Sequence, residues 1–108
     1  MQNSIIENVK RLIEERGWEE FHKPSYLVNS LAVEVSELMN CCLWHTPEEI
    51  DKMFLNQEEE IVKELADIAM NFYSIIRFSN IDIDSAVQHK VDELLVRYSN
   101  LNKGEHRK

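Results

Sequence analysis

Hydrophobic residues recur every three or four positions along most of this chain, the spacing of an α-helix that turns about 100° per residue. Potential capping residues precede two of the hydrophobic runs: Ser4 with Glu7 three positions later, and Asp82 or Asp84 near the end of the chain. The pattern therefore predicts four long helices, over residues 4–16, 26–44, 58–79 and 85–100.

The segments between these helices are short. We expect a loop over residues 17–25, because Gly17 is a natural helix stop. Thr46-Pro47 is a further helix-start signal and predicts a short helical turn that continues through Phe54. The helix 58–79 is hydrophobic over a wide arc, so we expect it to be central or to pack against a partner subunit.

The composition agrees with an all-α fold. The chain has 108 residues, of which 44% are hydrophobic and 30% are charged, and only two Gly and two Pro interrupt it. Few helix breakers favour long helices over many short strands. We therefore predict one domain over residues 1–108, a four-helix-type bundle, with a frayed polar tail over 102–108.

Charge and cysteine content narrow the class of protein. With 12 basic and 20 acidic residues the net charge is −8, which argues against a general binder of nucleic-acid polymers. It does not exclude a nucleotide substrate, because a divalent ion can lie between acidic side chains and phosphate. No signal peptide or membrane-length apolar run is visible, and Cys41 and Cys42 read as reduced thiols, so we expect a cytoplasmic protein without membrane association.

Two acidic pairs are the main candidates for chemistry. Glu34 and Glu37 lie three positions apart, as do Glu64 and Asp67, and each pair borders its hydrophobic stripe on the same side. If the two stripes pack together, the four carboxylates converge at one edge of the contact. Converging carboxylates repel one another unless a cation neutralises them, and oxygen ligands favour Mg²⁺ or Mn²⁺.

Simpler and competing interpretations of these pairs exist. In a chain with 20 acidic residues a single pair is usually a solvated helix face, and it is the repetition at the same angle that favours a metal site. A di-iron carboxylate bundle uses histidine three positions after glutamate. This chain has Glu37 and Asp67 at those positions, so redox iron is disfavoured.

Five further residues each have a structural and a functional interpretation. Lys90 and Arg97 lie seven residues apart on one helix side, where they form either a solvated basic edge or a clamp on a polyphosphate. Trp18 and Trp44 either pack in a core or an interface, or stack on a base. His22 either supports its loop or contacts the nucleotide.

Together these residues resemble the MazG-like all-α nucleoside triphosphate pyrophosphohydrolases, and among them the dCTP pyrophosphatases. The resemblance extends over about residues 7–98. The motifs that carry it are Trp18-Glu19-Glu20-Phe21-His22-Lys23-Pro24, Glu34-Val35-Ser36-Glu37, Trp44, Glu64-Leu65-Ala66-Asp67, Lys90 and Arg97-Tyr98. In the dCTP branch an aromatic residue tends to stand at the position of Asn71, and a polar residue can stand at that of Val9.

The resemblance implies a specific chemistry. It implies bundles that assemble as dimers or as tetramers of two dimers, and we expect a homotetramer here. The acids at Glu34, Glu37, Glu64 and Asp67 would hold Mg²⁺, and a metal-activated water would attack the α-phosphorus to give a nucleoside monophosphate and pyrophosphate. The resemblance also implies that Trp18 and Trp44 line the base pocket and that Lys90, Arg97 and Tyr98 lie in the helix on the phosphate side. We expect His22 to be a substrate-binding residue as well.

The sequence thus predicts a Mg²⁺-dependent pyrophosphohydrolase of (d)NTPs, with a dCTP-like substrate as the first expectation. One alternative is a house-cleaning hydrolase of modified or non-canonical triphosphates. Another is a non-catalytic helical oligomerisation module whose acidic residues are only surface.

Overall fold

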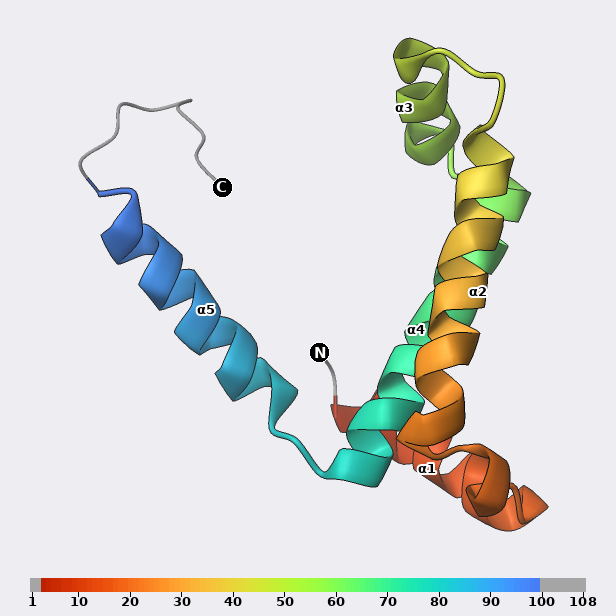
Figure 1. The fold of residues 1–108 in the computed structure, drawn as a ribbon, viewed down its shortest axis with the longest axis vertical. Coiled ribbons are helices and arrows are strands. Elements are labelled where there is room, and N and C mark those ends of the chain that lie inside the picture. The colour runs from red at the N-terminus through yellow and green to blue at the C-terminus, as the bar shows by residue number, and fades with distance from the viewer. Residues whose placement is uncertain (1–2, 100–108) are drawn as a thin grey trace.

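The computed structural model describes residues 3–99 and confirms the predicted all-α class (Figure 1). These residues form five α-helices and one 3-10 turn, with no strand among them. The elements are α1 (Asn3–Arg16), η1 (Glu19–Phe21), α2 (Pro24–Cys42), α3 (Pro47–Leu55), α4 (Glu59–Ser79) and α5 (Ile83–Arg97). The Ser4 side chain, predicted as a cap, and the tail 102–108 lie outside the described part of the chain.

The predicted helices are confirmed, with ends that differ by at most three residues. Helix α2 begins at Pro24, two residues earlier than predicted, because proline fits the first turn of a helix. The short turn predicted after Thr46 is a helix of 9 residues. Its capping box is complete: the Glu49 amide donates to Thr46 Oγ1 at 3.2 Å, and the Thr46 amide donates to Glu49 Oε1 at 2.7 Å.

The junction between α4 and α5 is also set by local chemistry. Asn80 ends α4 in the left-handed conformation with φ 54°, which asparagine tolerates better than most residues. The Asp82 side chain then accepts a hydrogen bond from the Ser85 amide at 3.1 Å. Of the two predicted caps, Asp82 is therefore the one that starts α5, two residues before the predicted start.

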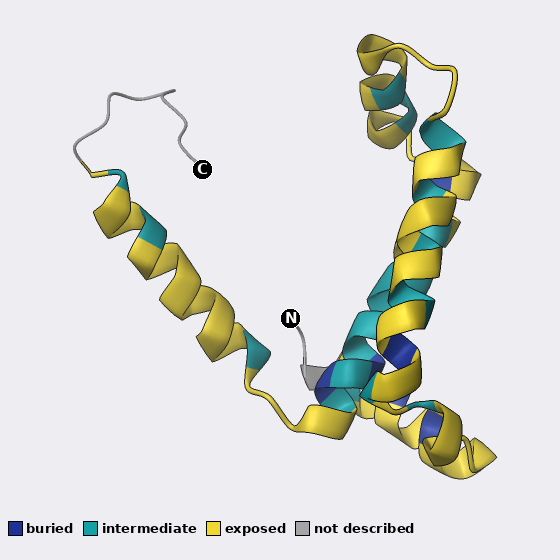
Figure 2. Ribbon diagram, viewed as in Figure 1, coloured by how far each residue is buried: buried dark blue, intermediate teal, exposed yellow. Residues whose placement is uncertain are grey.

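Helix α4 is central, as its wide hydrophobic arc predicts. It runs antiparallel beside α2 and packs against α1 near its own C-terminal end (Figure 1). Figure 2 shows that most of the buried positions gather where α1, α2 and α4 meet. The buried hydrophobic residues are Val9, Ile13, Leu27, Ile61 and Ile76.

Helix α5 extends away from the other helices and packs along none of them in the described chain (Figure 1). The radius of gyration is 17.2 Å, whereas a compact domain of this size has about 13 Å. The bundle is therefore open within one chain. None of the helices between residues 3 and 99 has both the length and the apolar character needed to cross a membrane.

Candidate metal centre

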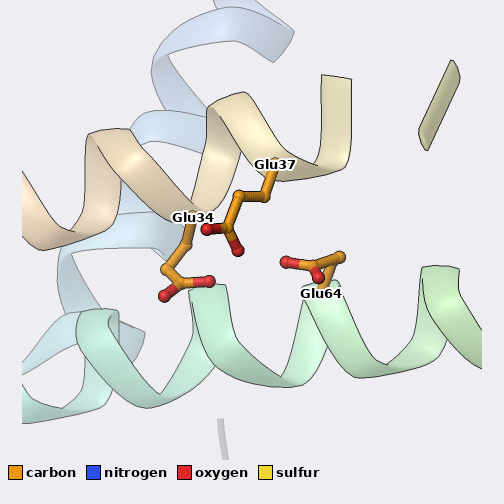
Figure 3. A group of neighbouring side chains, drawn as sticks. All are labelled: Glu34, Glu37 and Glu64. Atoms are coloured by element: carbon orange, nitrogen blue, oxygen red, sulfur yellow. The ribbon is translucent and has the colours of Figure 1, made fainter. Parts of the chain in front are cut away.

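Three carboxylates converge between α2 and α4. Glu34 and Glu37 come from successive turns of α2 and Glu64 from the facing side of α4 (Figure 3). One oxygen from each of the three lies within 4.8 Å of the other two. Oxygens bound to one Mg²⁺ lie at most about 4.2 Å apart, since each is about 2.1 Å from the ion. Small side-chain movements would therefore let all three bind one ion.

Two of these carboxylates have an oxygen whose hydrogen-bonding capacity is unused. Glu34 Oε2 and Glu64 Oε2 are both buried, and neither accepts a hydrogen bond from any residue that the structure describes. Buried polar atoms in folded proteins nearly always have a partner. A cation between the helices would provide a partner for these two carboxylates.

The electrostatics of the cluster point the same way. Burial, followed by the negative charges of Glu37, Asp67 and Glu64, raises the pKa of Glu34 above its ordinary value. Burial also raises the pKa of Glu64, again with the charges of Glu37 and Asp67 adding to it and Lys63 opposing it. The surroundings of Glu34 and Glu64 thus disfavour the ionised form of each carboxyl group. A bound cation would favour the ionised form instead.

Asp67, the fourth predicted ligand, lies outside the close group of three oxygens. It follows Glu64 by one turn of α4, and its charge contributes to the raised pKa of both Glu34 and Glu64. The Asn71 side chain donates to the Asp67 backbone carbonyl at 3.0 Å. The structure therefore gathers three of the four predicted acids and keeps the fourth within electrostatic reach.

The acids converge, as expected if the two hydrophobic stripes pack together, but the stripes are not buried along their whole length. Val35 and Leu65, which directly follow Glu34 and Glu64, are 40% and 43% exposed. Each helix is rotated about its axis so that the side bearing the carboxylates faces the other helix, and Glu34 and Glu64 therefore face each other. The physical reason is the angle between neighbours: a residue directly after an inward-facing one points about 100° away.

Trp18 and His22 lie together in the segment between α1 and α2. Their rings stack with centroids 5.9 Å apart and planes inclined by 11°. Burial, with a further contribution from the positive charge of Arg77, lowers the pKa of His22. The His22 ring therefore backs the indole of Trp18 within this segment.

Trp44 lies at the opposite end of α2 from this ring pair. Its side chain is 97% exposed, so within one chain it is not a core residue. Its φ of 68° is in the left-handed region that bulky side chains rarely adopt. Because the 19 residues of α2 extend about 28 Å, one chain does not bring Trp18 and Trp44 to the same base.

The predicted phosphate-side residues are on α5, away from the acidic cluster. Glu93 pairs with both cations, at 3.3 Å from Lys90 Nζ and 2.6 Å from Arg97 Nη2. Tyr98 follows Arg97 at the C-terminal end of α5. Since α5 packs along no other helix, one chain does not bring Lys90, Arg97 or Tyr98 to the carboxylates.

Sequence reasoning missed Arg77, which connects α4 to the Trp18–His22 segment. Its Nη2 donates to the His22 carbonyl at 3.0 Å. The available signal was a basic residue directly after Ile76, at the end of a wide hydrophobic arc. That signal indicates a partly buried charge, but it does not predict which residue accepts its hydrogen bond.

Comparison with known proteins bears on the family. No protein-family model matches the chain. The chain is 31% identical over 99 residues to dCTP pyrophosphatase 1 of Bos taurus, and 30% identical over 99 residues to dCTP pyrophosphatase 1 of Homo sapiens. Both alignments cover 86% of this chain, but only 59% and 58% of the respective relative, so the chain spans little more than half the length of these curated proteins. These similarities confirm the resemblance to the dCTP pyrophosphatase branch of the MazG-like proteins that the acidic and aromatic motifs indicate.

Proposed function

We propose that this protein is a Mg²⁺-dependent nucleoside triphosphate pyrophosphohydrolase that releases a monophosphate and pyrophosphate. The observation that carries the proposal is the set of three carboxylates between α2 and α4, two of them with a buried oxygen that has no partner among the described residues. The similarity to proteins named dCTP pyrophosphatase 1 supports the same reaction class.

The residues have distinct roles in this proposal. Glu34, Glu37 and Glu64 bind Mg²⁺ (or Mn²⁺ in its place), and Asp67 completes the ligand set from the next turn of α4. When bound, the ion polarises phosphoryl oxygens and lowers the pKa of a bound water. The acids fix the ion at the contact of two helices, which is a more rigid position than a loop.

A purely structural role for the acids is harder to support. Three carboxylates that face each other across a helix contact repel one another, and burial adds to the cost of keeping Glu34 and Glu64 charged. A non-catalytic oligomerisation module would gain nothing from this arrangement. A cation-binding site gains its affinity from it.

The base preference is proposed as dCTP-like, with Trp18, His22 and Trp44 on the base side. Two positions favour a second candidate, hydrolysis of modified or non-canonical triphosphates. Val9 is buried in the core and so offers a base no polar contact. Asn71 uses its amide on the Asp67 carbonyl, where the dCTP branch tends to have an aromatic residue.

We further propose that the chain works as a homo-oligomer, with a tetramer of two dimers favoured. The open shape and the exposed hydrophobic residues of α5, including Val91 and Leu95, support this. A second copy would also supply what one chain lacks near its acids: a cationic helix with Lys90, Arg97 and Tyr98, and a second tryptophan. The free thiols of Cys41 and Cys42 fit a cytoplasmic location.

The test is hydrolysis of a panel of natural and modified dNTPs by purified protein, followed by phosphorus NMR. We expect a monophosphate and pyrophosphate as first products, with activity that is lost in chelator and restored by Mg²⁺. Glu64→Gln should lose most activity, while Glu60→Gln, the same change at an exposed position one turn earlier, should retain it. Orthophosphate and a diphosphate as first products, or full turnover in chelator, would overturn the proposal.

A further inference from the structure

One hydrogen bond ties the aromatic segment to the far end of α4. Arg77 Nη2 donates to the His22 carbonyl at 3.0 Å, across 55 positions of sequence. By contrast, the side chains of Ser36 and Ser74 bond within their own helix turn. The Arg77 bond therefore fixes the relative position of two elements, which the local bonds do not.

The surroundings of Arg77 make this bond costly to lose. Arg77 is half-buried, and its Nε is buried with no hydrogen-bond partner among the described residues. His22 Nδ1 is in the same condition. The guanidinium lies over the Phe78 ring of its own helix, with Cζ 6.0 Å from the ring centroid, and its bond to the His22 carbonyl links it to the aromatic segment. A carbonyl bonded to a charged donor is held more firmly than one bonded to water.

The same segment carries Trp18, whose position is fixed from two sides. On one side the Trp18 amide donates to the carbonyl of Ile13, a fully buried residue of α1, at 3.0 Å. On the other side the indole stacks on the His22 ring, whose backbone Arg77 holds. The indole is 41% exposed, so one part of it is supported by the protein and the rest is open to a ligand.

We propose that Arg77 is a positioning residue, which holds the His22 carbonyl on α4 and thereby presents the Trp18 indole as a stacking wall for the base of the substrate. Arg77 lies ten residues, or about 15 Å, beyond Asp67 on the same helix. The Arg77 bond thus ties the aromatic segment to the helix that carries Glu64 and Asp67. The inference rests on the proposed function, because it assigns the base end of the same substrate.

The first arm of the test follows Trp18 directly and needs no activity. In a Trp44→Phe background Trp18 is the one tryptophan of the chain. Arg77→Met keeps a long apolar side chain but removes the donor, and we expect faster acrylamide quenching of Trp18 and a weaker near-ultraviolet circular dichroism signal. Arg11→Met removes the same charge from an exposed position of α1 and should change neither. Unchanged quenching and circular dichroism in Arg77→Met would overturn the proposal.

The second arm uses kinetics in the chain with both tryptophans. Arg77→Met should raise KM for the best dNTP roughly tenfold, the scale of one lost base–aromatic stack, with kcat nearly unchanged. A lower kcat at unchanged KM, or a lower melting temperature with unchanged KM, would show a structural role only and overturn the proposal.

Two other outcomes need a second measurement: a variant that does not fold, and a wild-type chain without activity. If Arg77→Met does not fold, Arg77→Gln decides by the same measurements, since its side chain is polar but its amide nitrogen lies two bonds closer to the backbone than the Arg77 Nη2 that donates to the His22 carbonyl. If the wild-type chain hydrolyses no triphosphate, the proposed function fails. The quenching arm then still decides whether Arg77 positions Trp18.

Discussion

The carboxylates of Glu34 and Glu64 face each other across the contact between α2 and α4, and each has one buried oxygen without a hydrogen-bond partner among residues 3–99 (Figure 3). Burial and the neighbouring negative charges raise the pKa of both groups. The contact is therefore least favourable when both groups are ionised and no cation is present. This relationship leads to predictions about pH and about metal.

The first prediction concerns pH. For Glu34 and Glu64 the folded-state pKa is above the ordinary value of 4.5, so the folded chain holds more protons than the unfolded chain in that window. Their contribution to stability is complete below about pH 4.5 and is lost as pH rises through the raised values. We expect Glu64→Gln to melt at a higher temperature than the wild type in chelator, by a margin that grows as pH rises from 4.5.

The comparison with the variant is needed because His22 acts in the opposite direction. The pKa of His22 is lowered below 6.5, so its contribution to stability rises with pH below that value. His22 is present in both proteins and cancels in the difference between their melting temperatures. A difference that does not change with pH would contradict the electrostatic account of the cluster.

The local parts of the fold follow from the sequence, and the arrangement between helices follows less completely. The helical spacing of the hydrophobic residues predicts that Glu34 and Glu64 occupy equivalent positions beside their stripes. The Thr46 capping box also forms, as its spacing indicates. The rotation that exposes Val35 does not follow, because a hydrophobic stripe fixes a helix face only to within about one residue position. The bond from Arg77 to His22 joins residues 55 positions apart, and no local pattern contains it.

The second prediction concerns metal and separates two effects of one substitution. Glu37→Gln removes one charge from the cluster, so the ion-free protein should become more stable. It also removes a ligand, so Mg²⁺ affinity should fall. Replacing a residue that only supports a metal ligand lowers the affinity about 10-fold to 100-fold, and we expect at least that loss for Glu37. Thermal melts with and without Mg²⁺ measure both effects.

For the wild-type chain, Mg²⁺ at about 100 times its dissociation constant should add about 2.7 kcal/mol of stability. Glu60→Gln is the matched control and should respond to Mg²⁺ like the wild type. Equal Mg²⁺ stabilisation of Glu37→Gln and wild type would exclude Glu37 as a ligand.

The third prediction concerns Trp44, which is almost fully exposed and has a φ of 68°. Replacing a core tryptophan by alanine costs about 3–5 kcal/mol, whereas Trp44→Ala should cost under about 1 kcal/mol because little packing is lost. Trp44→Gly should stabilise the chain by about 1 kcal/mol, since glycine adopts positive φ without the steric cost. Urea denaturation at several protein concentrations checks both values.

The same variants test the role of Trp44 toward substrate. If Trp44 stacks on a base, both variants should raise KM although one is more stable and the other slightly less stable than the wild type. Folded variants with unchanged KM and base preference would exclude this role. A loss of several kcal/mol in Trp44→Ala would instead show that Trp44 is buried in an interface.

The fourth prediction concerns assembly through α5. Val91 lies on the hydrophobic side of α5 and is 43% exposed, although α5 packs along no other helix of the described chain. We expect light scattering to give a multiple of 12.8 kDa for the wild type at micromolar concentration. Val91→Glu places a charge on this side and should shift the protein toward the monomer, because a charge buried in an interface without a partner is costly.

A matched control is available on the same helix. Val96 is 76% exposed and lies five residues, or about 140°, around α5 from Val91. Val96→Glu introduces the same charge on another side, so it should leave the assembly intact. If Lys90 and Arg97 act on the triphosphate bound by a neighbouring copy, Val91→Glu should also lose activity in proportion to its dissociation. Raising the protein concentration should then restore the assembly and the activity together. A stable wild-type monomer with activity, or a dissociated Val91→Glu with full activity, would show that one chain holds a complete site.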